Sequence, residues 1–179
     1  CDLFQAMNWK MDADSANCFY TAIGTDCGFF RFANTTAKTM RAAAMLLEWG
    51  AKPNVISDAL DVRARETVEL LGKVLPSLTF VADGRIAYLT ITHDLYDKTV
   101  NTDSFVSYPR TIEGVDVAIM FKAVEENVTR ISMRSKKTNV ADIALRFGGG
   151  GHIRAAGCSI DAPVGEARKL LLAELAQVM

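Results

Sequence analysis

The chain has 179 residues, of which half are hydrophobic and 23% are charged, and its formal net charge is −1. This composition is typical of a folded globular chain and argues against disorder. The near-neutral charge argues against a protein that binds duplex DNA, for which a basic domain is expected. The apolar runs are shorter than the roughly 20 residues that cross a bilayer, so we expect no membrane partner.

Four cysteines are scattered along the sequence without a CxxC pair, which argues against a zinc knuckle or a redox dithiol. The first residues show neither the basic region nor the apolar core of a secretion signal. We therefore expect reduced thiols and a cytoplasmic location.

The chain up to residue 76 has the pattern of helices. Residues 13–25 place apolar side chains on one face at helical spacing, and Asp12 or Asp14 is suited to cap the start. We expect further helices from Thr35 or Thr36 to Trp49, from Pro53, and over residues 63–75, with a short extended segment over 29–34. Pro76 ends the last of these helices. The sequence thus predicts a helical first part over residues 1–76.

From residue 77 the pattern changes to strands, which predicts an α/β domain over residues 77–179. Two β-rich runs over 78–92 are joined by Asp83-Gly84, a strong hairpin signal. A second strand pair is expected over 115–126 and 128–135, followed by a helix over 140–147, a brief strand at Cys158-Ser159-Ile160 and a terminal helix from about Val164. We expect a mixed β-sheet flanked by helices.

The strand over 128–135 carries a pattern that bears on binding. Ile131 and Met133 alternate with Arg130, Ser132 and Arg134. Because successive side chains of a strand point to opposite faces, one face is apolar and the other is polar. The polar face is available for a ligand.

The most unusual segment is the run Gly148, Gly149, Gly150, Gly151 and His152, which follows a predicted helix. Residues without Cβ allow several backbone N–H groups to approach one ligand, and such a concave row of amides binds anions such as phosphate. The alternative is a hinge or tight loop between packed elements. The histidine is suited to donate to a phosphate or to transfer a proton, although a lone histidine is more often structural.

A basic segment, Arg134-Ser135-Lys136, ends the strand over 128–135. Arginine offers a planar fork for phosphate, serine a hydroxyl and lysine a point charge. By itself such a segment is usually a solvated turn. One short helix separates it from the glycine run, so both segments are expected to line one site.

Asp26 lies in the segment Thr25-Asp26-Cys27-Gly28 at a predicted helix-to-strand junction. Its carboxylate suits a hard cation such as manganese or magnesium, although an aspartate here more often caps a turn. One carboxylate does not make a catalytic metal centre, because a two-metal phosphoesterase site needs several ligands.

Three segments together resemble the DHH phosphoesterase family, in particular its short bacterial members that act as oligoribonucleases and 3′-phosphoadenosine 5′-phosphate phosphatases. They are TDCG with the following GFFRFANTT (residues 28–36), SMRSK, and GGGGH with the later AAG (residues 148–157). The resemblance covers nearly the whole chain. It implies that Asp26 ligates manganese and that Arg134, the glycines of the run and His152 bind the phosphate and nucleotide of the substrate.

The other motifs of that family, an HxxPDxD-type cluster, a second isolated aspartate and the DHH triplet, do not occur in the 179 residues. The resemblance therefore implies a C-terminal remnant of the catalytic domain over 1–76 and a complete DHH-associated domain over 77–179. We expect the substrate-binding portion of a manganese-dependent phosphoesterase that acts on short oligoribonucleotides or nucleotide phosphates, and we expect this chain alone to be inactive. The alternative is a non-catalytic module that binds RNA or single-stranded DNA.

Overall fold

The computed structural model describes all residues from 1 to 179, and they form two compact units, Cys1–Val62 and Arg63–Met179. This division lies before helix α5 (Arg65–Val74) and not at residue 76 as expected. The physical reason is that α5 buries Leu70 and Val74 in a cluster with apolar residues of the second unit's sheet. No helix of the chain combines the length and the apolar character needed to cross a membrane.

The first unit consists of the helices α1 (Asp2–Ala6), α2 (Ala13–Asp26), α3 (Ala37–Glu48) and α4 (Pro53–Asp61). Asp12 caps α2 by accepting from the backbone N–H of Ser15, and Thr36 caps α3 by accepting from the N–H of Thr39. These two caps confirm the starts that the sequence predicted. Apolar residues from the helices and their connections, among them Tyr20, Leu46 and Ile56, form the core of the unit.

The segment over 29–34 is not the extended segment that was expected. Three consecutive residues, Gly28, Phe29 and Phe30, have positive φ values of 59°, 51° and 66°. The N–H of Phe29 donates to the Gly24 carbonyl at 2.6 Å, and the N–H of Phe32 donates to the Cys27 carbonyl at 3.1 Å. The backbone therefore forms a series of tight turns at the C-terminus of α2, and these short-range hydrogen bonds stabilise them.

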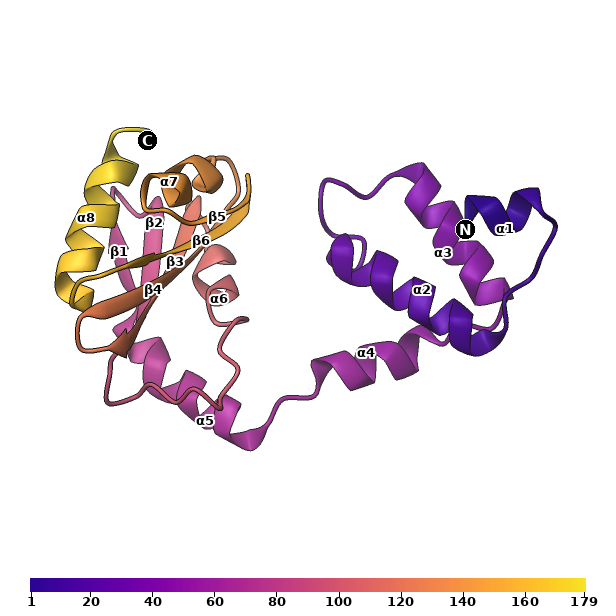
Figure 1. Ribbon diagram of the computed structural model, residues 1–179, viewed down its shortest axis with the longest axis horizontal. Helices are drawn as coiled ribbons and strands as arrows, with labels where there is room; N and C mark the ends of the chain where they lie inside the picture. Colours follow the sequence, from indigo (N-terminus) through magenta and orange to yellow (C-terminus); the bar gives the residue numbers. More distant parts are fainter. The chain divides into compact units, whose positions relative to one another are not determined.

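The second unit is a six-stranded mixed sheet with helices on both faces (Figure 1). In chain order its elements are α5, a 3-10 turn over Leu75–Ser77, β1 (Thr79–Val81), β2 (Ile86–Ile91), α6 (Ser107–Arg110), β3 (Val117–Glu125), β4 (Val128–Ser135), α7 (Val140–Arg146), β5 (Gly150–His152), β6 (Ala155–Ile160) and α8 (Val164–Ala176). The strand order is β1-β2-β3-β4-β6-β5, in which β2 and β3 are parallel and all other neighbours are antiparallel. This confirms the predicted fold class.

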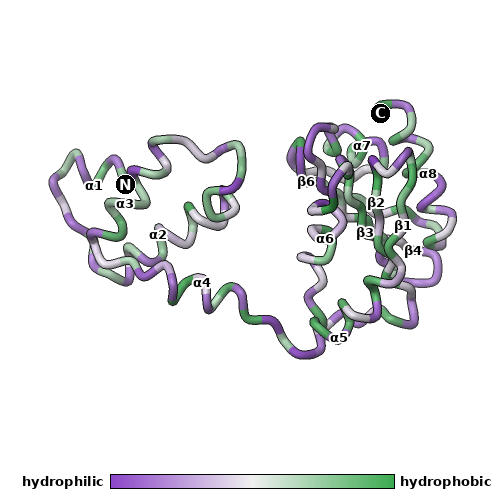
Figure 2. Tube along the Cα trace, turned by 180° about the vertical axis from the view of Figure 1, so that it is seen from behind, coloured by the Kyte–Doolittle hydropathy of each residue, from purple (hydrophilic) through white to green (hydrophobic).

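Both faces of the central strands are buried. On one face, residues such as Phe121, Ile131 and Met133 pack against α7 and α8, which contribute Ile143 and Leu171. On the other face, β2 and β3 are covered by α5, by α6 and by the segment that carries Phe105. Figure 2 shows β2 and β3 as continuous hydrophobic stretches, as expected for strands that are buried on both sides.

The apolar layer formed by α5, α6 and the Phe105 segment covers β2 and β3 only. On β4, β6 and β5, the face opposite α7 and α8 therefore lacks an apolar layer. We call this surface the open face; on its three strands it consists of Arg130, Ser132, Arg134, Gly150, His152, Ala155, Gly157 and Ser159. Its assignment follows from β4, where Ile131 and Met133 are buried in the core under the helices. The alternation predicted for this strand is therefore confirmed.

Candidate functional site

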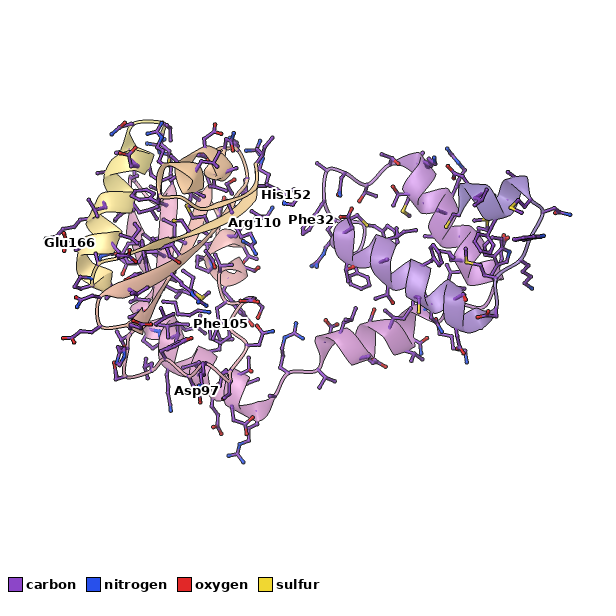
Figure 3. All side chains as sticks on the ribbon, in the orientation of Figure 1. Phe32, Asp97, Phe105, Arg110, His152 and Glu166 are labelled. Carbon is purple, nitrogen blue, oxygen red and sulfur yellow. The ribbon has the colours of Figure 1, made fainter.

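Strand register places two of the predicted site residues, Arg134 and His152, in one row. Arg134 of β4 pairs with Ala155 of β6, which in turn pairs with His152 of β5. Because laterally paired residues point to the same side of a sheet, both side chains project from the open face. Figure 3 shows His152 and Arg110 on the side of the sheet away from α8, whose Glu166 marks the opposite face.

The next row of the open face has almost no side chains. Ser132 pairs with Gly157, and Gly157 pairs with Gly150. A Cβ added to Gly150 would meet no atom within 4 Å, so open space lies above this strand. These three residues form a floor on which a flat ligand group has direct access to the backbone.

A third row carries positive charge. Lys122 of β3 lies directly opposite Arg130 of β4 in the ladder. Neither the ammonium group of Lys122 nor the guanidinium group of Arg130 takes part in an ion pair. Lys122 is partly buried and Arg130 is exposed. The floor is thus flanked by cations at both ends.

Arg110 at the end of α6 adds a further cation beside Arg134. Its Nε donates to the Ser135 carbonyl at 3.4 Å, which fixes it against the end of β4. The guanidinium group of Arg134 itself folds back to donate to the Met133 carbonyl at 2.9 Å. Neither arginine is neutralised by an ion pair.

The charges of the site influence one another. Burial lowers the pKa of Lys122, the carboxylate of Asp103 opposes that shift, and the positive charge of Arg130 adds to it. Burial also lowers the pKa of Arg134, with the same opposition from Asp103 and a further lowering by Arg110. Arg134 nevertheless stays protonated, as arginine does in proteins. The site therefore contains two pairs of like charges, Lys122 with Arg130 and Arg134 with Arg110, and one nearby carboxylate. This arrangement favours a bound anion.

Two other predicted residues do not face this site. Ser135 is fully buried, and its hydroxyl donates to the Thr138 carbonyl at 2.5 Å. The Nζ of Lys136 donates to the Ile112 carbonyl at 3.1 Å, and its backbone N–H donates to Asp116. Both residues therefore fix the turn after β4, and Arg134 is the member of the basic segment that reaches the open face.

The glycine run is also arranged differently from the expected loop of amides. It follows the C-terminus of α7, and the N–H groups of Gly148 and Gly149 donate to the carbonyls of Leu145 and Ala144. From Gly150 the run continues as the edge strand β5. At Gly149 the missing side chain serves close packing, because a Cβ there would lie 2.2 Å from the Gly157 carbonyl oxygen.

Asp26, the predicted metal ligand, belongs to the first unit and ends α2. The Nδ2 of Asn34 donates to its Oδ2 at 3.1 Å, and the strained turn at Phe29 and Phe30 follows directly. Left-handed backbone is uncommon for such bulky residues and often accompanies functional sites. Asp26 also lines a cavity of about 640 Å³ within this unit.

The residues of this chain do not by themselves fit a manganese centre. No group of three or more His, Cys, Asp or Glu side chains is placed to hold a metal ion. Asp26 contributes one carboxylate, and Asn34 turns its amide nitrogen, a donor, toward it. A two-metal site needs several carboxylate and imidazole ligands. Asp26 therefore fits one ligand position of such a site at most.

Sequence reasoning missed Asp103 and Arg110 as neighbours of Arg134, and it missed Lys122 as the partner of Arg130. A signal was present for Lys122, because it is the one charged residue in the apolar run over 117–121 and 123–124. A lysine within a strand that is otherwise buried needs a reason, since lysine is almost never fully buried unless it is paired. No comparable signal exists for Asp103 and Arg110, whose positions depend on how the segment after β2 folds.

Comparison with known proteins identifies the family of the chain. The DHHA1 domain family matches residues 83–179. The bifunctional oligoribonuclease and PAP phosphatase NrnA of Thermus thermophilus is 36% identical over 89% of this chain and 49% of its own length, and the Bacillus subtilis protein of the same name is 29% identical over 85% and 49%. An exopolyphosphatase-related protein from Bacteroides fragilis superposes with a TM-score of 0.83 at 26% identity, over 93% of this chain and 51% of that chain.

The chain spans about half the length of the curated relatives it matches. The domain match alone covers more than half of the chain. The chain therefore belongs to the DHH phosphoesterase family and carries the DHHA1 domain of that family.

Proposed function

We propose that the chain supplies the nucleotide-binding part of a manganese-dependent phosphoesterase that hydrolyses short oligoribonucleotides or nucleotide phosphates in the cytoplasm. The observation that carries this proposal is the open face. Arg134 and His152 lie in one row beside a floor of small residues, and Arg134 has no ion-pair partner. Unpaired arginine and histidine side chains are the groups that bind phosphate in charge-assisted hydrogen bonds.

The relatives give the proposal its substrate class. The proteins from Thermus thermophilus and Bacillus subtilis are named for hydrolysis of oligoribonucleotides and of PAP. Both substrates carry phosphates on a nucleoside, and the open face offers cations together with a flat floor for the rest of the ligand. The substrate class therefore agrees with the chemistry of the residues on this face.

Catalysis requires more metal ligands than the one carboxylate that Asp26 offers. Asp26 would be one manganese ligand, and further ligands would come from residues outside these 179. Manganese bound in such a site would activate a water molecule for attack on phosphorus. We therefore propose that the chain as it stands binds nucleotides but does not hydrolyse them.

Binding titrations test the nucleotide-binding part. Arg134→Ala should weaken the binding of AMP by about tenfold to 100-fold, because a hydrogen bond to a charged group contributes about 1.5–3 kcal/mol. His152→Ala should weaken it in the same direction. Lys169→Ala is the matched control, because it removes a positive charge from the exposed surface of α8 on the other face. Equal affinities for wild type and Arg134→Ala would contradict the proposal.

The second candidate, a non-catalytic module that binds RNA or single-stranded DNA, uses the same open face. It is favoured by the observation that no group of three or more His, Cys, Asp or Glu side chains is placed to hold a metal ion. Hydrolysis separates the two candidates. If the first candidate is right, a longer protein that includes residues 1–179 should release mononucleotides from a short oligoribonucleotide when manganese is added. If the second is right, the same protein should bind the oligoribonucleotide without hydrolysing it.

A further inference from the structure

Strand β5 carries His152, but it has little side-chain packing of its own. It is an edge strand of three residues, Gly150, Gly151 and His152, and all three are exposed. Two of them are glycines, the residues that lose most conformational freedom when a strand forms. Apart from the ladder with β6, the position of His152 therefore depends on contacts at the ends of β5.

The hairpin tip between β5 and β6, formed by Ile153 and Arg154, provides such contacts. The N–H of Ser135 donates to the Arg154 carbonyl at 3.1 Å, and the N–H of Val140 donates to the Ile153 carbonyl at 3.0 Å. These two bonds join the tip to the end of β4 and to the start of α7.

The side chain of Arg154 fastens the tip to the turn over residues 136–138. Its Nη1 donates to the carbonyl of Lys137 and to the carbonyl of Thr138, the latter at 2.8 Å. Arg154 forms no ion pair, although it is an exposed cation near the candidate site. Its guanidinium group is thus directed at backbone carbonyls of the chain itself.

Asp116 holds the same turn through its N–H groups. Its carboxylate accepts from the backbone N–H groups of residues 136–138 and from the hydroxyl of Thr138. The peptide group that joins Lys137 to Thr138 is therefore bound by Arg154 at its carbonyl and by Asp116 at its N–H. Hydrogen bonds in such a chain polarise and strengthen one another, which makes the turn a firm anchor for the hairpin.

We propose that Arg154 is a positioning residue that fixes His152 relative to Arg134. Arg134 lies two residues before the turn that Arg154 binds, and His152 lies two residues before Arg154 itself. The contact therefore connects the two side chains that the proposed function assigns to the phosphate of the ligand, and the inference rests on that function. Arg154 acts through His152 and does not bind the ligand itself.

A double-variant cycle with AMP separates positioning from direct binding of the phosphate by Arg154. In calorimetric titrations, Arg154→Ala should weaken AMP by about threefold to tenfold, up to the loss that His152→Ala causes. When residue 152 is already alanine, Arg154→Ala should change the affinity by less than about twofold, because residues that act through one another are not additive. Lys169→Ala on α8 is the matched control and should leave AMP binding unchanged.

Proton NMR follows His152 directly, because His93 and His152 are the only two histidines of the 179 residues. His93 follows the end of β2 and serves as the internal reference. At saturating AMP, the ring signals of His152 should shift in the wild-type chain and shift much less in Arg154→Ala. A full shift of His152 in Arg154→Ala would contradict the positioning role.

The titrations distinguish failure of this inference from failure of the proposed function. If Arg154→Ala binds AMP like wild type, or costs the same factor with and without His152, the inference is wrong while the nucleotide-binding face stands. If the wild-type chain binds no AMP, the proposed function fails and the inference fails with it. Thermal unfolding verifies that each variant is folded. If Arg154→Ala does not fold, Arg154→Lys takes its place in the same cycle, with the same expected outcomes.

Discussion

Two neighbouring glycines of the run should respond to alanine in opposite ways, although the substitution is chemically the same. A Cβ on Gly149 would lie 2.2 Å from the Gly157 carbonyl oxygen and 2.6 Å from the Cβ of Cys158. Backbone has to move to relieve these contacts, so β5 would be pushed away from β6. A Cβ on Gly150 would meet nothing within 4 Å. Gly149→Ala tests packing, and Gly150→Ala tests the ligand surface.

Overpacking of this kind typically costs about 1–3 kcal/mol. For a unit of this size, each kcal/mol lowers the melting temperature by about 4 °C, so Gly149→Ala should melt about 4–12 °C below wild type. Gly150→Ala should melt within about 2 °C of wild type, because its methyl group meets open space. It should instead weaken nucleotide binding several-fold, because that methyl group stands on the floor of the open face.

Circular dichroism melting measures the stability of both variants. Tryptophan fluorescence gives an internal control, because Trp9 and Trp49 both belong to the first unit and the second unit has no tryptophan. Hydrogen exchange of the peptides that cover β5 and β6 should show faster exchange in Gly149→Ala alone. The packing argument would be refuted if Gly149→Ala melted with wild type, or if Gly150→Ala lost as much stability.

Three further predictions concern other parts of the chain. Burial raises the pKa of Asp116, but hydrogen bonds from Thr138 and neighbouring backbone amides outweigh that effect and lower the pKa. Asp116→Ala should therefore lower the free energy of unfolding at neutral pH by about 1–2 kcal/mol, and urea titrations should show this difference shrinking as the pH falls below about 4. Burial raises the pKa of the Cys158 thiol to about 11, so mass spectrometry after alkylation at mildly alkaline pH should find the exposed Cys18 modified first. Thr36→Ala removes the cap of α3 and should cost about 1 kcal/mol in the tryptophan-detected unfolding of the first unit.

Local signals predicted most of the elements. Asp83-Gly84 forms the expected turn between β1 and β2, with positive φ at both residues. The alternation along β4 identified the polar face that became the candidate site. The same alternation also indicates on which face Ser135 lies. Ser135 has the same parity as Ile131 and Met133, so its side chain belongs to the buried face and not beside Arg134.

Long-range pairing accounts for what the sequence did not show. The glycine run has no apolar alternation. Position 149 requires a glycine because β6 lies too close to leave room for a Cβ there. The curled segment after Asp26 depends on left-handed backbone at Phe29 and Phe30, which bulky residues rarely adopt. Arg110 reaches the site because α6 folds back onto the sheet, a placement that local pattern does not encode.

The open face concentrates features that weaken the fold, and the opposite face of the same strands offsets them. Lys122 and Arg130 repel each other, and each glycine in a strand costs roughly 0.5–1 kcal/mol relative to alanine. Beneath them, Phe121 and Leu171 are fully buried in the core that α7 and α8 cover, and burial of such a side chain contributes about 1.5–3 kcal/mol. If these costs are retained for binding, Lys122→Ala should gain stability as it loses affinity for a nucleotide phosphate. A variant that lost both would show that Lys122 supports the sheet rather than the ligand.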